Sequence, residues 1–125
     1  KDLNGIKTSE FDAVIFIGGP GTAIVRSDER FVKLAKEFYE KGKIVCAICW
    51  APTILAKAGV LEGKKTTVWV GFDPEYGKET IRVLESFGAN FENNAVVRDG
   101  KIITGNGPMA ASAFGKEIAK AMKGN

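Results

Sequence analysis

Short apolar runs alternate with amphipathic segments along this chain. Residues 13–17 and 44–48 are continuously apolar, which is typical of strands buried on both faces of a sheet. Residues 66–70 are β-branched and aromatic and predict a third strand. Residues 96–103 contain two β-type runs around an Asp-Gly pair, which predicts a hairpin.

The segments between these runs have the periodicity of helices. Four helices are expected. The first runs from an N-cap at Ser27 to Gly42, and the second from Pro52 to Gly59. The third runs from Asp73 to Gly88, and the fourth from Gly107 to Met122. Their inward faces are expected to hold Phe31, Leu34, Ala35, Phe38 and Tyr39, then Ile54, Leu55 and Ala58, then Ile81, Leu84 and Phe87, and finally Ala113, Phe114, Ile118 and Met122. Because strands alternate with helices, the fold class is α/β, with a mostly parallel sheet covered on both sides.

Composition narrows this picture without changing it. The 125 residues suit one domain, 1–125, and the net charge of +3 comes from interspersed charges rather than a basic stripe. We therefore expect no nucleic-acid partner, and no apolar run is long enough to cross a membrane. Two cysteines do not form a disulfide framework, so a reducing, cytoplasmic location is predicted. The absence of histidine excludes a Cys-His pair within this chain.

Cys49 directly follows the second apolar run and precedes the helix that begins near Pro52. A side chain at such a corner lies at the carboxyl edge of the sheet, as in the nucleophile elbow of hydrolases. The N–H groups of the following helix would lower the pKa of the thiol and favour the thiolate. The alternative is a small buried residue that packs the turn.

Two further features lie close to Cys49 in this reading. Cys46 is expected within the strand and in the core, so a dithiol redox role is not favoured. The loop 18–22 follows one strand and precedes a helix, but it fits neither nucleotide-binding glycine pattern. It could offer backbone N–H groups to an oxyanion, or it could be a tight turn only.

Taken together, these segments resemble the ThiJ/PfpI family of the class I glutamine amidotransferase-like superfamily. The residues that carry the resemblance are 11–19, 42–49, Pro52, Leu55, 58–64, 99–104 and 107–108. The resemblance implies a flavodoxin-like three-layer sandwich, of which this chain is the C-terminal part. It also implies that Cys49 is the nucleophile and that the N–H groups of Gly19 and Trp50 form an oxyanion hole.

The chain departs from the family pattern at the site. Trp50 stands where many members have a histidine after the nucleophile, and Val68 stands where others have one after Thr-Thr. Asn106 replaces a family arginine. The strand–helix unit that carries the family glutamate has no counterpart here, so we expect that an N-terminal segment or a second chain supplies an acidic partner for Cys49. Alternatively, this is a shortened paralogue.

The function predicted from these residues is that of a cysteine-dependent enzyme, of the hydrolase or glyoxalase/deglycase type. Cys49 would attack the carbonyl carbon of a small carbonyl or acyl substrate. No cofactor and no metal is expected, and the family implies a homo-oligomer. The alternatives are a non-catalytic oxidative-stress sensor or chaperone-like protein with an oxidisable Cys49, and a structural paralogue with an inert thiol.

Overall fold

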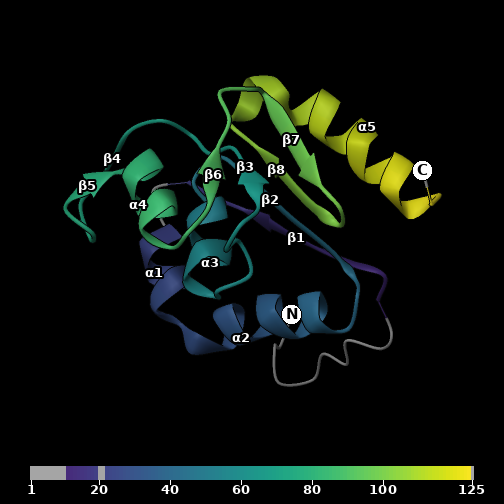
Figure 1. Cartoon of the computed structure of the whole chain (residues 1–125), viewed down its shortest axis with the longest axis horizontal. Coiled ribbons are helices and arrows are strands. Elements are labelled where there is room, and N and C mark those ends of the chain that lie inside the picture. Colours follow the sequence, from purple (N-terminus) through teal and green to yellow (C-terminus); the bar gives the residue numbers. More distant parts are fainter. Residues whose placement is uncertain (1–10, 20–21, 125) are drawn as a thin grey trace.

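Within the described residues, the main sheet has four strands in the order β1-β2-β8-β7 (Figure 1). The computed structural model describes residues 11–19 and 22–124. The strands are β1 (Ala13–Ile17), β2 (Ile44–Ile48), β7 (Val96–Asp99) and β8 (Ile102–Gly105). β1, β2 and β8 are parallel and β7 pairs antiparallel with β8, so the predicted mostly parallel sheet and the predicted hairpin are confirmed.

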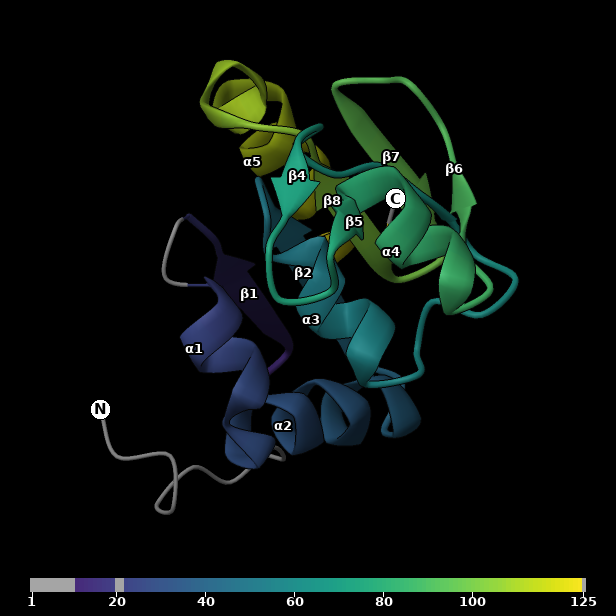
Figure 2. The same ribbon diagram turned by 90° about the vertical axis from the view of Figure 1, so that its left-hand side faces the viewer.

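Helices lie on both sides of this sheet (Figures 1 and 2). One side carries α1 (Thr22–Ser27), α2 (Glu29–Glu40), α3 (Pro52–Lys57) and α4 (Thr80–Ser86). The other side carries α5 (Ala111–Met122), which follows a 3-10 turn at Pro108–Ala110. The result is a three-layer α/β arrangement with a separate apolar core on each side of the sheet.

β2 lies between β1 and β8 and is buried at all five positions. Its alternating side chains enter both cores: Val45 and Ala47 pack toward α2 and α3, whereas Cys46 and Ile48 pack with Phe114 of α5. A continuous apolar sequence is what a strand with both faces covered requires. β2 therefore places the turn that follows it at the carboxyl edge of the sheet, between the ends of β1 and β8.

The predicted third strand is wrong for most of its length. Only β3 (Lys65–Thr66) is a strand, paired with β6 (Asn90–Phe91). The backbone then leaves the ladder, because the Thr67 N–H donates to the Thr104 hydroxyl at 3.0 Å and the Trp69 N–H donates to the Cys49 carbonyl at 2.7 Å. These long-range bonds replace the strand pairing that β-propensity alone would favour.

The helix predicted to begin at Asp73 is also wrong over its first part. Residues 72–79 form a small hairpin of β4 (Phe72–Asp73) and β5 (Lys78–Glu79), and α4 begins only at Thr80. The Asp73 carboxylate accepts the N–H groups of Glu75 and Tyr76, which stabilises a tight turn in place of a helix.

Two smaller helix predictions are corrected as well. The N-cap of α2 is Asp28, whose carboxylate accepts the Arg30 N–H, and Ser27 instead ends the preceding α1. On α5, Phe114 is buried but Ala113 and Met122 are exposed, because this helix touches the sheet along a narrow strip. Pro52 begins α3 as predicted.

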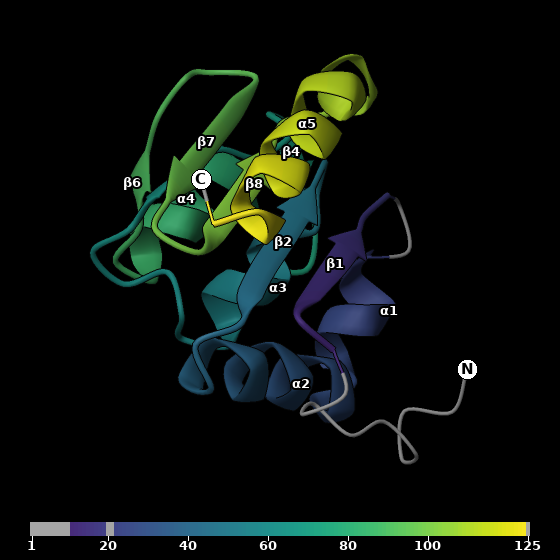
Figure 3. The ribbon, with the colours of Figure 1, turned by 90° about the vertical axis from the view of Figure 1, so that its right-hand side faces the viewer.

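β1 differs from the prediction on one face. Phe16 points toward α2 and α3 and is 7% exposed, whereas Ile15 is 47% and Ile17 is 81% exposed. Figure 3 shows the reason: α5 lies over β8 and β2 and does not extend over β1. Within the described residues β1 is also the edge strand of the sheet. Its apolar sequence therefore suits a strand covered on both faces, but only one face is covered here.

Candidate active site

Cys49 occupies a sharp turn between β2 and α3. Its φ is +65°, the left-handed region, and no other described non-glycine residue has a positive φ. The turn is held from both sides, because the Cys49 N–H donates to the Gly105 carbonyl at 3.0 Å and its carbonyl accepts the Trp69 N–H. Left-handed backbone at such a residue is strained and persists only when its surroundings impose it.

A second loop, after β1, lies directly against this turn. The Gly18 N–H donates to the Ile48 carbonyl at 3.2 Å, which extends the pairing of β1 with β2. A Cβ on Gly18 would lie 2.4 Å from the Ala51 nitrogen and 2.8 Å from the Thr22 hydroxyl. Only glycine lets the two loops approach this closely. The neighbouring residues 20–21 lie outside the described part of the chain.

These loops enclose one side of a cavity of about 350 Å³ at the carboxyl ends of the parallel strands. Such an edge is where α/β sheets bind ligands. Cys49 is half-buried at the wall of this cavity. The lining residues are Gly18, Gly19, Cys49, Trp50, Trp69 and Pro108. The structure thus brings together Gly19, Cys49 and Trp50, the three site residues that the sequence predicts.

The two backbone N–H groups expected to hold an oxyanion differ in whether they already have a hydrogen-bond acceptor. The Gly19 N–H donates to the Thr22 hydroxyl at 3.0 Å, so it already has an acceptor. The Trp50 N–H has no hydrogen-bond acceptor within the described residues. A ligand oxygen could therefore bind the Trp50 N–H without displacing an acceptor, whereas binding to the Gly19 N–H would require Thr22 to share or release it.

The predicted lowering of the Cys49 pKa is wrong for this part of the protein. Partial burial raises the pKa of the Cys49 thiol. α3 is only six residues long, and among the described residues no side chain donates a hydrogen bond to the sulfur. Cys46, by contrast, is a core residue as predicted: it is fully buried, and burial raises its pKa to about 12.

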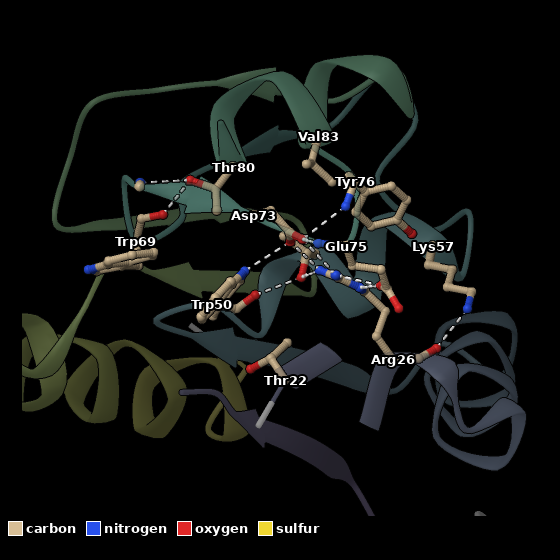
Figure 4. Close-up of polar contacts among 12 residues, drawn as sticks. Thr22, Arg26, Trp50, Lys57, Trp69, Asp73, Glu75, Tyr76, Thr80 and Val83 are labelled. Carbon is tan, nitrogen blue, oxygen red and sulfur yellow. Dashed lines mark hydrogen bonds and ion pairs between the residues drawn. The ribbon is translucent and has the colours of Figure 1, made fainter. Parts of the chain in front are cut away.

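Trp50 is held in place by a buried polar cluster that sequence reasoning missed (Figure 4). Its indole N–H donates to Asp73 at 3.0 Å, and its carbonyl accepts the Thr53 hydroxyl at 2.8 Å. Arg26 donates to both Asp73 oxygens, at 2.6 and 2.9 Å, and to Thr53 at 2.8 Å. Arg26 and Asp73 are both fully buried, and the guanidinium lies 4.4 Å from the centre of the Tyr76 ring.

This cluster fixes the charge of its members. Burial by itself raises the pKa of Asp73, but hydrogen bonds from Arg26, Trp50 and the Tyr76 backbone outweigh it and hold the pKa below its usual value. Glu75 adds a second carboxylate, 2.6 Å from Arg26. The ion pair therefore joins α1, the turn after Cys49 and the β4-β5 hairpin into one rigid unit.

Trp69 was also missed as a site residue, since the sequence suggests only a strand there. One signal was available: Trp69 directly follows Val68, the position where the resemblance places a histidine in other family members. Arg26 and Asp73 gave no comparable signal, because 47 residues separate the two partners and nothing local relates them.

The comparison with protein families agrees with this geometry. The model of the DJ-1/PfpI family matches residues 1–121. The chain belongs to the DJ-1/PfpI family. Solved members share its flavodoxin-like fold: a ThiJ/PfpI domain protein from Brachyspira murdochii superimposes with a TM-score of 0.85 at 29% identity, over 98% of this chain and 66% of its own.

Some proteins of similar sequence are uncharacterized, and others are named deglycases. An uncharacterized protein of Methanocaldococcus jannaschii is 37% identical over 100% of this chain and 58% of its own length. A Thermococcus kodakarensis protein named a deglycase is 35% identical over 94% of this chain and 66% of its own. This DJ-1/PfpI chain thus spans 58 to 66% of the length of these relatives.

The described residues of this DJ-1/PfpI chain contain no group of three or more histidine, cysteine or acidic side chains placed to hold a metal ion. No helix among them is long and apolar enough to span a membrane.

Proposed function

We propose that this chain carries the nucleophile of a cysteine-dependent enzyme acting on small carbonyl or acyl compounds, of the deglycase or glyoxalase type. The Cys49 sulfur, as thiolate, forms a bond to the carbonyl carbon, and the C=O π electrons move to oxygen. The Trp50 N–H donates to that oxyanion, with the Gly19 N–H as the second donor. An aldehyde then gives a hemithioacetal once the oxygen is protonated, and an acyl compound gives a thioester as its leaving group departs.

One observation carries the proposal. Cys49 is held at φ +65° beside a cavity, next to the Trp50 N–H that has no acceptor within the described residues. Strained backbone that holds a nucleophile at a cavity is a functional signature. The deglycase name of a 35% identical relative supports the same reaction class.

The Cys49 proton needs an acceptor, and no acid or base side chain bonds to the sulfur within the described residues. We expect this group to be a carboxylate on a further strand that pairs with the free edge of β1. The edge position of β1 among the described strands supports such a strand. The exposed Ile15 and Ile17 support a further element of the same segment that covers this face of β1. An N-terminal segment of the same protein is our first choice, and a second copy in a homo-oligomer is the alternative.

The activity is tested by the consumption of methylglyoxal. The protein with its acidic partner segment should consume this aldehyde at neutral pH, and Cys49→Ser should abolish consumption. Cys46→Ala is the matched control, because Cys46 is buried in β2 and does not line the cavity. Equal turnover by Cys49→Ser, or none by the unaltered protein, would contradict the proposal.

The further strand is tested by the behaviour of residues 1–125 alone. We expect association or loss of cooperative unfolding, which a segment that covers β1 should reverse. Sedimentation and thermal unfolding measure both. A stable monomer that unfolds cooperatively, with β1 amides protected from hydrogen exchange, argues against any added strand.

A second candidate is an oxidative-stress sensor in the cytoplasm, in which Cys49 is oxidised without turnover. It needs an accessible Cys49, which lines the cavity, and it requires no acid or base for turnover. Mass spectrometry after mild peroxide treatment distinguishes the two. Oxidation confined to Cys49 in a protein that consumes no aldehyde supports the sensor, and equal oxidation of Cys46 counts against it.

A further inference from the structure

Among the described residues, no charged side chain lines the cavity beside Cys49. Two indole rings, a proline and two glycines surround the thiol. A substrate with a carboxylate or ammonium group next to its carbonyl would lose water in this cavity and gain no ion pair. An apolar substituent loses nothing there and gains contact with the rings.

The Trp69 ring is held in a fixed place. It lies 5.2 Å from the Trp50 ring, centre to centre, at an interplanar angle of 39°. A Cβ on Gly71 would lie 2.2 to 2.8 Å from three atoms of the Trp69 ring, so the ring occupies the space that the absent side chain leaves. The Thr80 hydroxyl donates to the Trp69 carbonyl at 2.6 Å and fixes its backbone.

A separate set of contacts, through its indole N–H, holds the Trp50 ring. Its N–H is bound by Asp73, which the fully buried Arg26 holds in turn. Figure 4 shows the two rings next to each other, with the Arg26–Asp73 pair on the side of Trp50 away from Trp69 and with Thr80 beside the Trp69 carbonyl. The rings therefore do not depend on a ligand for their position, and a preformed wall needs little ordering when a ligand binds.

We propose that Trp50 and Trp69 form an aromatic wall that selects carbonyl compounds with a flat aromatic or bulky apolar substituent. The substituent stacks against the indoles while the carbonyl carbon faces the Cys49 sulfur. This selectivity rests on the proposed function, because it names the substrate class of the same site. Methylglyoxal and other small aldehydes fit the cavity but leave the wall unused.

Binding is tested first, with ketones that cannot be turned over as aldehydes are. Saturation-transfer NMR should show acetophenone bound at the site and acetone not bound. Trp69→Ala should weaken acetophenone binding about two- to tenfold, the range of one aromatic contact. Tyr39→Ala is the matched control, since Tyr39 is a comparably exposed aromatic on α2 that does not line the cavity, and it should have no effect.

Specificity is tested by the ratio of kcat/KM for phenylglyoxal to that for methylglyoxal. The two aldehydes differ in intrinsic reactivity, so the change of this ratio between variants is the measurement. Trp69→Ala should lower the ratio about tenfold. Gly71→Ala should also lower it, because the added methyl must displace the Trp69 ring without removing it. An unchanged ratio in both variants overturns the proposal.

The two proposals fail in different ways. If no aldehyde is consumed but acetophenone binds with the expected dependence on Trp69, the enzymatic function is wrong and the aromatic wall stands. If both aldehydes are consumed through Cys49 but acetophenone does not bind, the enzymatic function stands and the aromatic wall is wrong.

Discussion

Two regions flank Cys49, and they are completed to different degrees. On the side of α1, α3 and the β4-β5 hairpin, every polar group of the Arg26–Asp73 pair has a partner and Trp50 is held at both ends. On the side of β1, the apolar Ile15 and Ile17 face outward. The first region is complete within this chain. The second has the sequence of a buried surface without the contacts that would bury it.

The comparison teaches which half of the site this chain can build by itself. Its own residues hold Cys49, which we propose as the nucleophile, the Trp50 N–H, and the two rings of the proposed aromatic wall. We propose that the acid or base required by the chemistry lies on the side of β1.

Arg26→Met should reduce the free energy of unfolding by about 3–5 kcal/mol, because it leaves the Asp73 charge buried without a partner. Urea unfolding followed by circular dichroism measures the loss. Arg98→Met is the matched control: Arg98 pairs with Glu117, each about a quarter exposed, and its loss should cost less than about 1 kcal/mol. Similar small losses in both variants would show that the buried pair does not organise this side.

Acid should weaken the same region. The folded pKa of Asp73 lies below its unfolded value, so its stabilisation is present above the unfolded pKa, about 4, and is lost as pH falls through the folded pKa. Unfolding midpoints between pH 6 and pH 2 measure this loss. The unfolding midpoint of Asp73→Asn should be lower than that of the unaltered protein at pH 6, and it should change less between pH 6 and pH 2. The same slope in both proteins would assign the acid sensitivity to other carboxylates.

Gly18→Ala should cost about 1–3 kcal/mol, because its methyl meets the Ala51 backbone at 2.4 Å. Gly19→Ala is the control, since a Cβ there meets nothing within 4 Å. Thermal unfolding of the two variants should differ clearly. If both are neutral, the loops after β1 and β2 can separate, and the turn at Cys49 is less constrained than the contacts indicate.

Cys49→Gly should be more stable than Cys49→Ala by about 1 kcal/mol, because glycine adopts the left-handed φ of +65° without strain. Neither variant keeps the sulfur, so the comparison isolates the backbone. Denaturant midpoints measured in parallel provide the test. A more stable alanine variant would mean that the turn relaxes once the thiol is absent.

Ile17→Lys should reduce the association of the 125-residue chain and leave its circular dichroism spectrum unchanged, because the side chain is 81% exposed. Phe16→Ala, one position earlier on the covered face, should cost about 3–5 kcal/mol. When the segment proposed to cover β1 is present, Ile17→Lys should become destabilising. If Ile17→Lys is not destabilising when this segment is present, the segment does not cover this face of β1, which would contradict that proposal.

Local pattern was enough for the central elements. The apolar runs predicted β1 and β2, the Asp-Gly pair predicted the β7-β8 hairpin, and the position of Cys49 after a buried strand predicted the turn. Each of these depends on residues adjacent in sequence: the apolar content of a strand, the φ preference of glycine, and the corner between a strand and a helix.

The tertiary structure decided the rest, because the deciding contacts join distant residues. Asp73 belongs to a hairpin and not to a helix because Arg26 and Trp50 bind its carboxylate. Trp69 leaves its strand because Cys49 accepts its N–H. Burial, not the short α3 helix, sets the direction of the Cys49 pKa. A buried charge, a ring against a glycine and the exposure of one strand face depend on what packs beside them in space, and no local sequence pattern contains that information.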